Sequence, residues 1–218
     1  MRDAVIVSTA RTPIGKAYRG AFNATSTPTL AGHAIEHAVA RAGIDPARIE
    51  DVVFGAALQQ GTNFMNVARN AGIRAGLPVS VAGQSIDRQC ASGMMGIATA
   101  AKQIICDGMD VTVGGGVESI SMNQVPQSFQ ITDAWIKTNK PALYMTMLET
   151  AENVAERFNV SREEQDEYAL ASQQRTAAAQ EAGKFDDEIV AMKTVKKVMD
   201  KVTKEVSNEE VTLSKDEG

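Results

Sequence analysis

Short apolar runs alternate with segments of helical periodicity through the first half of the chain. Apolar runs of about four to eight residues bounded by turn residues are typical of buried strands, and apolar residues spaced three and four apart indicate helices. Four strands are therefore expected, at residues 4–9, 51–58, 84–87 and 110–116. Three helices are expected between them, at residues 27–42, 66–76 and 94–105. This alternation predicts an α/β fold with a mostly parallel sheet covered by helices on its faces.

Two of these helices carry further signals. Thr27 and Pro28 suit the N-cap and the first turn of the first helix, and Gly43 suits its end. The third helix is rich in Ala, Gly and Met on nearly every side, and Lys102 is its only charge between residues 94 and 105. A helix that is apolar all round is buried on all sides, so we expect another layer of structure beyond it.

The pattern changes after Glu118. Residues 119–145 have no clear period and are expected to form a long ordered loop. Two helices are expected next, at residues 148–160 and 161–183. Ser161 and Glu164 make a capping box at the start of the second one. The tail from residue 193 is mixed in charge and poor in large apolar residues, so we expect a solvated ribbon on the surface.

The composition excludes several functions. Of the 218 residues, 44% are hydrophobic and 22% are charged, with a formal net charge of -5 and no basic cluster that would bind nucleic acid. No apolar run approaches the roughly 18 residues of a membrane span, and the N-terminus has no apolar leader. Two cysteines without a pairing signature indicate a reducing compartment, so a cytoplasmic location is expected.

Cys90 lies where a predicted strand gives way to a predicted helix, and Ala91, Ser92 and Gly93 leave room around it. The unpaired N–H groups of a helix N-terminus stabilise a thiolate and raise its nucleophilic fraction. The N–H of Cys90 itself would face a developing oxyanion. A free cysteine is also often a small buried hydrophobe, and the pattern alone leaves that alternative open. Cys106, in the apolar end of the helix, is expected to be of this second kind.

The sequence offers no base for a nucleophilic Cys90, although such a cysteine usually needs one, most often a histidine. The only histidines, His33 and His37, share one face of the first helix and are expected at its rim. They lack a third ligand at a suitable spacing, so no metal site is expected.

The glycine-rich residues 113–119 follow a strand but lack the pattern G-x-G-x-x-G, which disfavours dinucleotide binding. Close packing of the strand end, or a glycine floor near the cysteine, explains them better. Glu118 is expected to be a buried hydrogen-bonded or dimer-facing carboxylate rather than an acid catalyst. A domain boundary is expected between residues 116 and 121.

Four motifs, in order, resemble those of the thiolases, which are acetyl-CoA acyltransferases, and the resemblance covers essentially the whole chain. They are VIVSTARTPIGKAYRGAF, QCASGMMGI, VGGGVESIS and TAENVAERFNVSREEQDEYALASQ. The resemblance implies a layered α-β-α-β-α fold of two similar halves with a lid inserted in the first. It assigns residues 1–117 to the N-terminal half and residues 118–218 to part of the lid, truncated before the C-terminal half.

The resemblance also implies an activity. Cys90 would be the acyl-accepting nucleophile, its N–H would form part of an oxyanion hole, and Met147 would approach the acyl chain and the pantetheine of the substrate. The reaction would be thiolytic cleavage of a 3-ketoacyl-CoA to acetyl-CoA and a shortened acyl-CoA, or the reverse Claisen condensation. Coenzyme A would be a substrate, and no cofactor is expected. A homodimer or homotetramer is implied.

Three features depart from the family's pattern. The family's base histidine, acid cysteine and water-holding asparagine lie in a second half, so this chain is interpreted as a fragment that is inactive alone and exposes apolar surface. Asp87 stands where relatives commonly carry Asn, and an unpaired carboxylate there would disfavour the thiolate unless Arg88 neutralises it. Thr146 precedes Met147 where short-chain acetoacetyl-CoA enzymes often have His, which favours a degradative role in fatty acid metabolism.

Two alternatives stay open on the residues alone. A ketoacyl synthase-type condensing enzyme of the same broad fold would share the cysteine at the helix start but would leave the lid motifs unexplained. A non-catalytic half-domain that acts in dimerisation would predict that the natural gene ends near Gly218.

Overall fold

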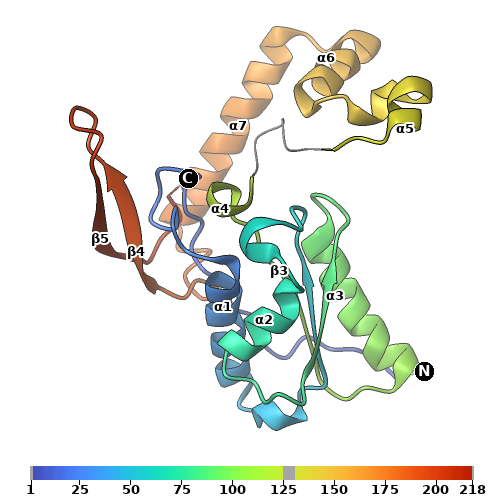
Figure 1. Ribbon diagram of the computed structural model, residues 1–218, viewed down its shortest axis with the longest axis vertical. Helices are drawn as coiled ribbons and strands as arrows, with labels where there is room; N and C mark the ends of the chain where they lie inside the picture. Colours follow the sequence, from blue (N-terminus) through green and yellow to red (C-terminus); the bar gives the residue numbers. More distant parts are fainter. Residues whose placement is uncertain (1, 125–130, 218) are drawn as a thin grey trace. The chain divides into compact units, whose positions relative to one another are not determined.

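The computed structural model describes residues 2–124 and 131–217, which form two compact units (Figure 1). One unit comprises Met1–Gln124 together with Glu188–Gly218, and the other comprises Val125–Asp187. No helix in the described parts of the chain is long and apolar enough to cross a membrane.

Three parallel strands form the sheet of the first unit, in the order β2-β1-β3. They are β1 (Asp51–Gly55), β2 (Ala82–Ile86) and β3 (Thr112–Gly116). Asp51 pairs with Ala82 on one side and with Thr112 on the other, so the three strands end at the same edge of the sheet. Three of the four predicted strands are confirmed, and so is the α/β class with its parallel sheet.

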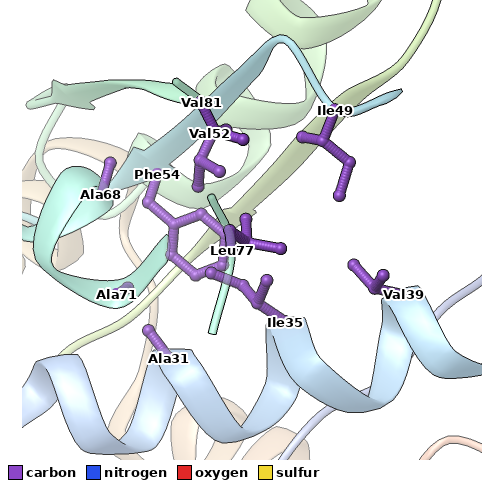
Figure 2. Packing of buried hydrophobic residues seen from close by; sticks show 10 residues of the cluster. All are labelled: Ala31, Ile35, Val39, Ile49, Val52, Phe54, Ala68, Ala71, Leu77 and Val81. Atoms are coloured by element: carbon purple, nitrogen blue, oxygen red, sulfur yellow. The ribbon is translucent and has the colours of Figure 1, made fainter. Parts of the chain in front are cut away.

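Helices cover both faces of this sheet. On one face lie α1 (Thr27–Ala42) and α2 (Val67–Arg74), and on the other lies α3 (Ser92–Lys102). The main apolar core lies between α1, α2 and the sheet (Figure 2) and consists of Ala31, Ile35, Val39, Ile49, Val52, Phe54, Ala68, Ala71, Leu77 and Val81. Full burial of each larger aliphatic or aromatic side chain in such a core contributes about 1.5–3 kcal/mol.

The ends of α1 follow the sequence signals with one correction. Gly43 adopts a left-handed φ of 64° directly after the helix, and its N–H donates a hydrogen bond to the carbonyl of Ala40. The predicted N-cap is wrong by one residue, because Ser26 has the extended cap conformation and Thr27 is already helical. The hydroxyl of Thr27 instead lies 3.0 Å from that of Thr62, so tertiary structure takes up the group that a cap would use.

The prediction that the third helix is buried on all sides is wrong for this chain. Ser92, Gly96 and Ala100 of α3 are buried against the sheet. Met94 on the opposite side is 73% exposed, and Ile97 is 44% exposed. The apolar outer face of α3 therefore meets solvent. The helix continues into a π-helical turn at Gln103–Asp107 and ends at Gly108, which has a φ of 81°.

The predicted strand at residues 4–9 is also absent. Val5, Ile6 and Val7 form no strand and are 73%, 78% and 71% exposed. A run of this composition suits a strand that is covered on both faces, and the described residues do not supply that cover. The segment instead borders an apolar cavity of about 840 Å³ that is also lined by α1, α3 and β3.

The end of the first unit is an antiparallel hairpin of β4 (Met192–Met199) and β5 (Val206–Leu213), which confirms the surface ribbon expected there. Met192 is buried against Phe22 and Leu30. This packing joins the tail to the N-terminal unit, whereas the predicted domains 1–117 and 118–218 join it to the lid. That division, which follows the family resemblance, stays a prediction.

Carboxylates close to the C-terminus hold a loop close to the N-terminus. Asp216 accepts two hydrogen bonds from the guanidinium of Arg11, at 2.8 and 3.0 Å, and one from the N–H of Ile14. Glu217 accepts hydrogen bonds from the N–H groups of Lys16 and Ala21. Arg11 also pairs with Glu188 at 2.6 Å. These contacts tie the two ends of the first unit together.

Short helices replace much of the loop predicted at residues 119–145. They are α4 (Ile120–Asn123), α5 (Ala134–Asn139) and the 3-10 turn Pro141–Tyr144. Residues 125–130 of that prediction lie outside the described residues. The loop prediction is therefore wrong in part, because caps such as Asp133 start helices too short to show a period.

The two helices predicted in the lid are confirmed as α6 (Met147–Phe158) and α7 (Arg162–Glu181). The capping box of Ser161 and Glu164 starts α7 as predicted. A second box, in which Thr146 accepts from the N–H of Glu149 and that carboxylate accepts from the N–H of Thr146, starts α6. Two further 3-10 turns lie in the first unit, at Pro46–Arg48 and Gly61–Asn63.

Candidate active site

Cys90 lies in the turn between the end of β2 and the start of α3, and it is exposed. This turn is at the edge where all three parallel strands end. In open α/β sheets, ligands bind at this edge, beyond the carboxyl ends of the strands. The structure therefore places Cys90 at an accessible helix start, as predicted, and not within a core.

The backbone of the turn is held in an uncommon conformation. Gln89 has a φ of 49°, in the left-handed region that non-glycine residues seldom occupy. Its N–H donates to Oδ1 of Asp87 at 2.8 Å, and its carbonyl accepts from the N–H of Ser92 at 3.0 Å. The N–H of Ala91 donates to the carbonyl of Arg88. The N–H of Cys90 takes part in none of these bonds, and its role towards a ligand stays a prediction.

The structure also gives Asp87 a role that the sequence left open. Its carboxylate accepts the N–H of Gln89 and so forms part of the turn. No ion pair joins Asp87 to Arg88 within residues 2–124 and 131–217. The proposed neutralisation of Asp87 by Arg88 is therefore not what the structure shows.

Glycines form the floor beneath this turn. A Cβ added to Gly55, at the end of β1, would overlap the carbonyl of Ser92. A Cβ on Gly116, at the end of β3, would lie 2.7 Å from the Cα of Gly93, and one on Gly96 would lie 2.5 Å from the carbonyl oxygen of Gly115. Contacts below 3.0 Å are not tolerated by real Cβ atoms, so α3 can approach the sheet this closely only across glycines. The prediction of close packing at the glycine-rich strand end is confirmed.

Glu118 follows this floor and is a hydrogen-bonded carboxylate, as predicted, but it is half-buried rather than buried. Oε2 accepts from the N–H groups of Ala57 and Leu58, at 3.1 and 2.9 Å. Oε1 accepts from the side-chain amides of Asn63 and Asn123, at 3.0 and 3.1 Å. A carboxylate with this many donors is held in place, and it joins the chain after β1 to the chain after β3.

Asn123 extends this polar network. It is 0% exposed, and its Oδ1 accepts from both the N–H and the hydroxyl of Thr62, at 2.7 and 2.8 Å. Asn63 is 1% exposed and donates to the carbonyl of Leu58. Sequence reasoning missed these residues, because an isolated Asn between unremarkable neighbours gives no sign that its partner lies 61 residues away.

The other candidate residues of the first unit do not join Cys90. His33 Nε2 lies 3.1 Å from the carbonyl oxygen of Ala191, and its ring lies 4.6 Å from that of His37. Burial lowers the pKa of His33, and the neighbouring His37 lowers it further. Both rings are half-buried on α1, near the predicted rim. No group of three or more metal-ligating side chains occurs among the described residues.

Cys106 lies in the π-helical turn after α3. Helical rise places this turn roughly 20 Å along the helix from Cys90. The expectation that Cys106 is buried is wrong, because it is exposed. The apolar sequence around it led to that expectation, but this end of the helix meets solvent.

Met147 is the first residue of α6, in the second compact unit, and is 74% exposed. Its approach to a bound acyl chain stays a prediction. The apolar cavity beside residues 4–17 is lined by Gly116 and Glu118, but neither Cys90 nor any other residue of its turn borders it.

Comparison with known proteins gives one family. The family model described as "Thiolase, N-terminal domain" matches residues 4–216. The 3-ketoacyl-CoA thiolase of Bacillus subtilis is 41% identical over 192 residues, which are 87% of this chain and 49% of that protein. The acetyl-CoA acetyltransferase of Cupriavidus necator is 38% identical over 87% of this chain and 51% of its own length.

A solved structure shows the same fold. The crystal structure of the Bacillus anthracis acetyl-CoA acetyltransferase matches with a TM-score of 0.81 and 36% identity, covering 100% of this chain and 55% of that one. The peroxisomal 3-ketoacyl-CoA thiolase 2 of Arabidopsis thaliana is 36% identical over 99% of this chain and 46% of its own length. The chain spans about half the length of the curated relatives that it matches.

Proposed function

The chain belongs to the thiolase family, and on that basis we propose that it carries the nucleophile of a CoA-dependent acyl transfer, with Cys90 as the residue that takes up the acyl group. The observation that carries this proposal is the position of Cys90. It is an exposed thiol at the start of α3, on the edge where three parallel strands end. Helix N-termini stabilise anions at such positions.

The reaction that fits is thiolysis of a 3-ketoacyl-CoA. The Cys90 thiolate attacks the 3-keto carbon, and the carbonyl oxygen becomes an oxyanion near the N–H of Cys90. The bond between C2 and C3 then breaks, and its electron pair leaves on C2 as the enolate of acetyl-CoA, which takes up a proton. The thiolate of CoA attacks the acyl-cysteine, releases the shortened acyl-CoA and regenerates Cys90. Run backward, the same steps are a Claisen condensation.

We propose that the base and the acid of this reaction come from residues outside this chain. The ring of His33, on α1, bonds to the carbonyl of Ala191, and Cys106 lies beyond the far end of α3. Neither is therefore placed to exchange a proton at Cys90. The chain alone is then expected to show no turnover of a 3-ketoacyl-CoA with CoA.

The remaining features of the proposal follow the family. Met147 would contact the acyl chain or the pantetheine, and Thr146 before it favours degradative 3-ketoacyl-CoA cleavage. A homodimer or homotetramer and a cytoplasmic location are proposed, although some relatives are peroxisomal. The match to the thiolase model over residues 4–216 leaves the ketoacyl synthase alternative without support.

The test compares the two cysteines within one molecule. Both Cys90 and Cys106 are exposed, so accessibility does not separate them. We expect iodoacetamide to alkylate Cys90 several-fold faster at pH 7, as measured by mass spectrometry of the two peptides, because the N–H groups at the start of α3 stabilise negative charge beside it. The variant Cys90→Ser provides the control for peptide assignment. Equal rates would contradict the nucleophile role.

A further inference from the structure

We propose that Ser92 is a positioning residue for Cys90, because its hydroxyl holds the turn that presents the thiol. This inference rests on the proposed role of Cys90 as the nucleophile. Ser92 is the first residue of α3 and is 4% exposed. Its hydroxyl bonds to the turn before the helix, while the N-cap position is occupied by Ala91.

The hydroxyl of Ser92 makes two hydrogen bonds to the turn that precedes it. Oγ accepts from the N–H of Arg88 at 2.8 Å and donates to the carbonyl oxygen of Gln89 at 2.6 Å. Both bonds go to residues directly before Cys90. Only a group that accepts and donates at one atom makes this pair of bonds, and a hydroxyl is such a group.

Gln89 is the residue that most needs this support. A left-handed φ on a non-glycine residue costs free energy and persists only where the surroundings hold it. Three contacts hold Gln89 at its φ of 49°, namely the Asp87 carboxylate on its N–H and the N–H and hydroxyl of Ser92 on its carbonyl. Loss of the hydroxyl would weaken the hold on Gln89, and the backbone of Cys90 follows directly.

The helix itself cannot move to compensate. The carbonyl of Ser92 lies against Gly55 of β1, and Gly93 lies against Gly116 of β3, with no room for a Cβ at Gly55 or Gly116. The start of α3 is therefore fixed on the sheet, and only the turn is free to relax. Removal of the hydroxyl is then expected to change the placement of Cys90 while α3 stays docked.

The sharpest test is a pair of variants that differ only in the hydroxyl, Ser92→Thr and Ser92→Val. The two side chains have nearly the same shape, so any steric burden is shared. The measurement is the ratio of iodoacetamide alkylation rates at Cys90 and Cys106, followed from acid to alkaline pH in this chain. Thr112→Val serves as a control, because it removes a different hydrogen bond, from Thr112 to the carbonyl of Ala100 at the other end of α3.

We expect Ser92→Thr to keep the ratio of the parent chain and Ser92→Val to lower it about two- to fivefold, the range that a lost helix-dipole interaction gives. The ratio for Ser92→Val should stay below that for Ser92→Thr at every pH, while the alkylation rate of Cys106 should be the same in both variants. Thr112→Val should leave both cysteines unaffected. A general loss of stability would not produce this pattern, and thermal unfolding of all the variants checks for one.

Two failures have different meanings. If the parent chain alkylates Cys90 no faster than Cys106, the proposed function fails. If the parent shows the fast Cys90 but Ser92→Val and Ser92→Thr have equal ratios, the positioning role of Ser92 is overturned while the proposed function stands.

Discussion

The Cys90 turn and the N-terminal segment at residues 4–9 are both regions that the sequence marks clearly, and the structure completes only one of them. The turn is closed by hydrogen bonds from Asp87 and Ser92 and rests on glycines of β1 and β3. The N-terminal segment forms no strand, is largely exposed and borders a cavity. The turn, which is built from short-range polar contacts, has its hydrogen-bond partners within this chain, whereas the apolar run, which needs cover on two faces, lacks part of its cover among the described residues.

This comparison predicts that packing changes beneath the turn are costly. Gly55→Ala places a methyl group into the carbonyl of Ser92, so we expect the free energy of unfolding to fall by about 3 kcal/mol or more. Urea denaturation measures the loss. Gly72→Ala is the matched control, since its Cβ would lie 3.5 Å from Val52 Cγ2. In the middle of α2 that change should stabilise by about 0.5–1 kcal/mol. Similar effects of the two substitutions would contradict the close approach of α3.

The polar network at the same sheet edge gives the next largest effect. Asn123→Ala removes three hydrogen bonds of a fully buried side chain, two from Thr62 and one to Glu118, and we expect the free energy of unfolding to fall by about 2–3 kcal/mol. Asn70→Ala removes only weak bonds of 3.3 and 3.4 Å on the surface and should cost less than about 0.5 kcal/mol. If thermal melts of the two variants shift equally, the network does not hold the loop after β1.

The hydrogen bonds between Asp216 and the N-terminal loop should make an intermediate contribution to the free energy of unfolding, and this contribution should fall in acid. The hydrogen bonds from Arg11 hold the pKa of Asp216 below its ordinary value of 3.8. Because the folded pKa is the lower one, this stabilisation is present above the unfolded value and is lost as the pH falls through the folded value. We expect Asp216→Asn to lower the free energy of unfolding by about 1–2 kcal/mol at pH 7 and by less at pH 2.

Equilibrium unfolding of the parent chain and Asp216→Asn at both pH values measures this difference. Asp110→Asn is the control, because the pair of Asp110 with Arg2 is exposed and such pairs contribute little. A loss that stays the same at pH 2 would show that Asp216 acts through packing rather than through its charge.

The smallest change in the free energy of unfolding is expected for substitutions in residues 4–9. Ile6 is 78% exposed, so Ile6→Lys should change the free energy of unfolding by less than about 0.5 kcal/mol. The same substitution should reduce binding of a hydrophobic dye, because it removes exposed apolar surface. A loss comparable with that of Asn123→Ala would mean that residues 4–9 are packed in solution, and the contrast between the two regions would disappear.

Features that depend on a few neighbouring residues, such as helix ends and turns, were predicted from the sequence. Gly43, the capping box at Ser161 and the turn at Cys90 are each fixed by a few neighbouring residues, and the structure has them where the sequence indicates. The parallel sheet followed from the alternation of runs. Contacts between distant residues could not be predicted, since nothing near Asn123 points to Thr62. The hydrogen bonds of Ser92 are local, but the sequence does not show which groups of the turn its hydroxyl meets.

The sequence misled where burial depends on more than composition. Met94 and Val5 have the apolar neighbours of core residues, and both are exposed. An apolar pattern indicates that a segment is suited to being packed against other parts of a protein. The described residues provide only part of that packing for Met94 and Val5. Of the candidate site, the nucleophile position was predicted, while the side chains that shape it were recognised only in three dimensions.

The hydrogen bonds from the N–H groups of Lys16 and Ala21 to Glu217 make the conformation of this N-terminal loop depend on residues close to Gly218. Removal of Asp216 and Glu217 would shorten no described helix or strand, because β5 ends at Leu213, yet it would free the segment that follows Arg11. Limited digestion with an endoprotease should then cleave the chain first in that segment, although the segment lies some two hundred positions from Glu217 in sequence.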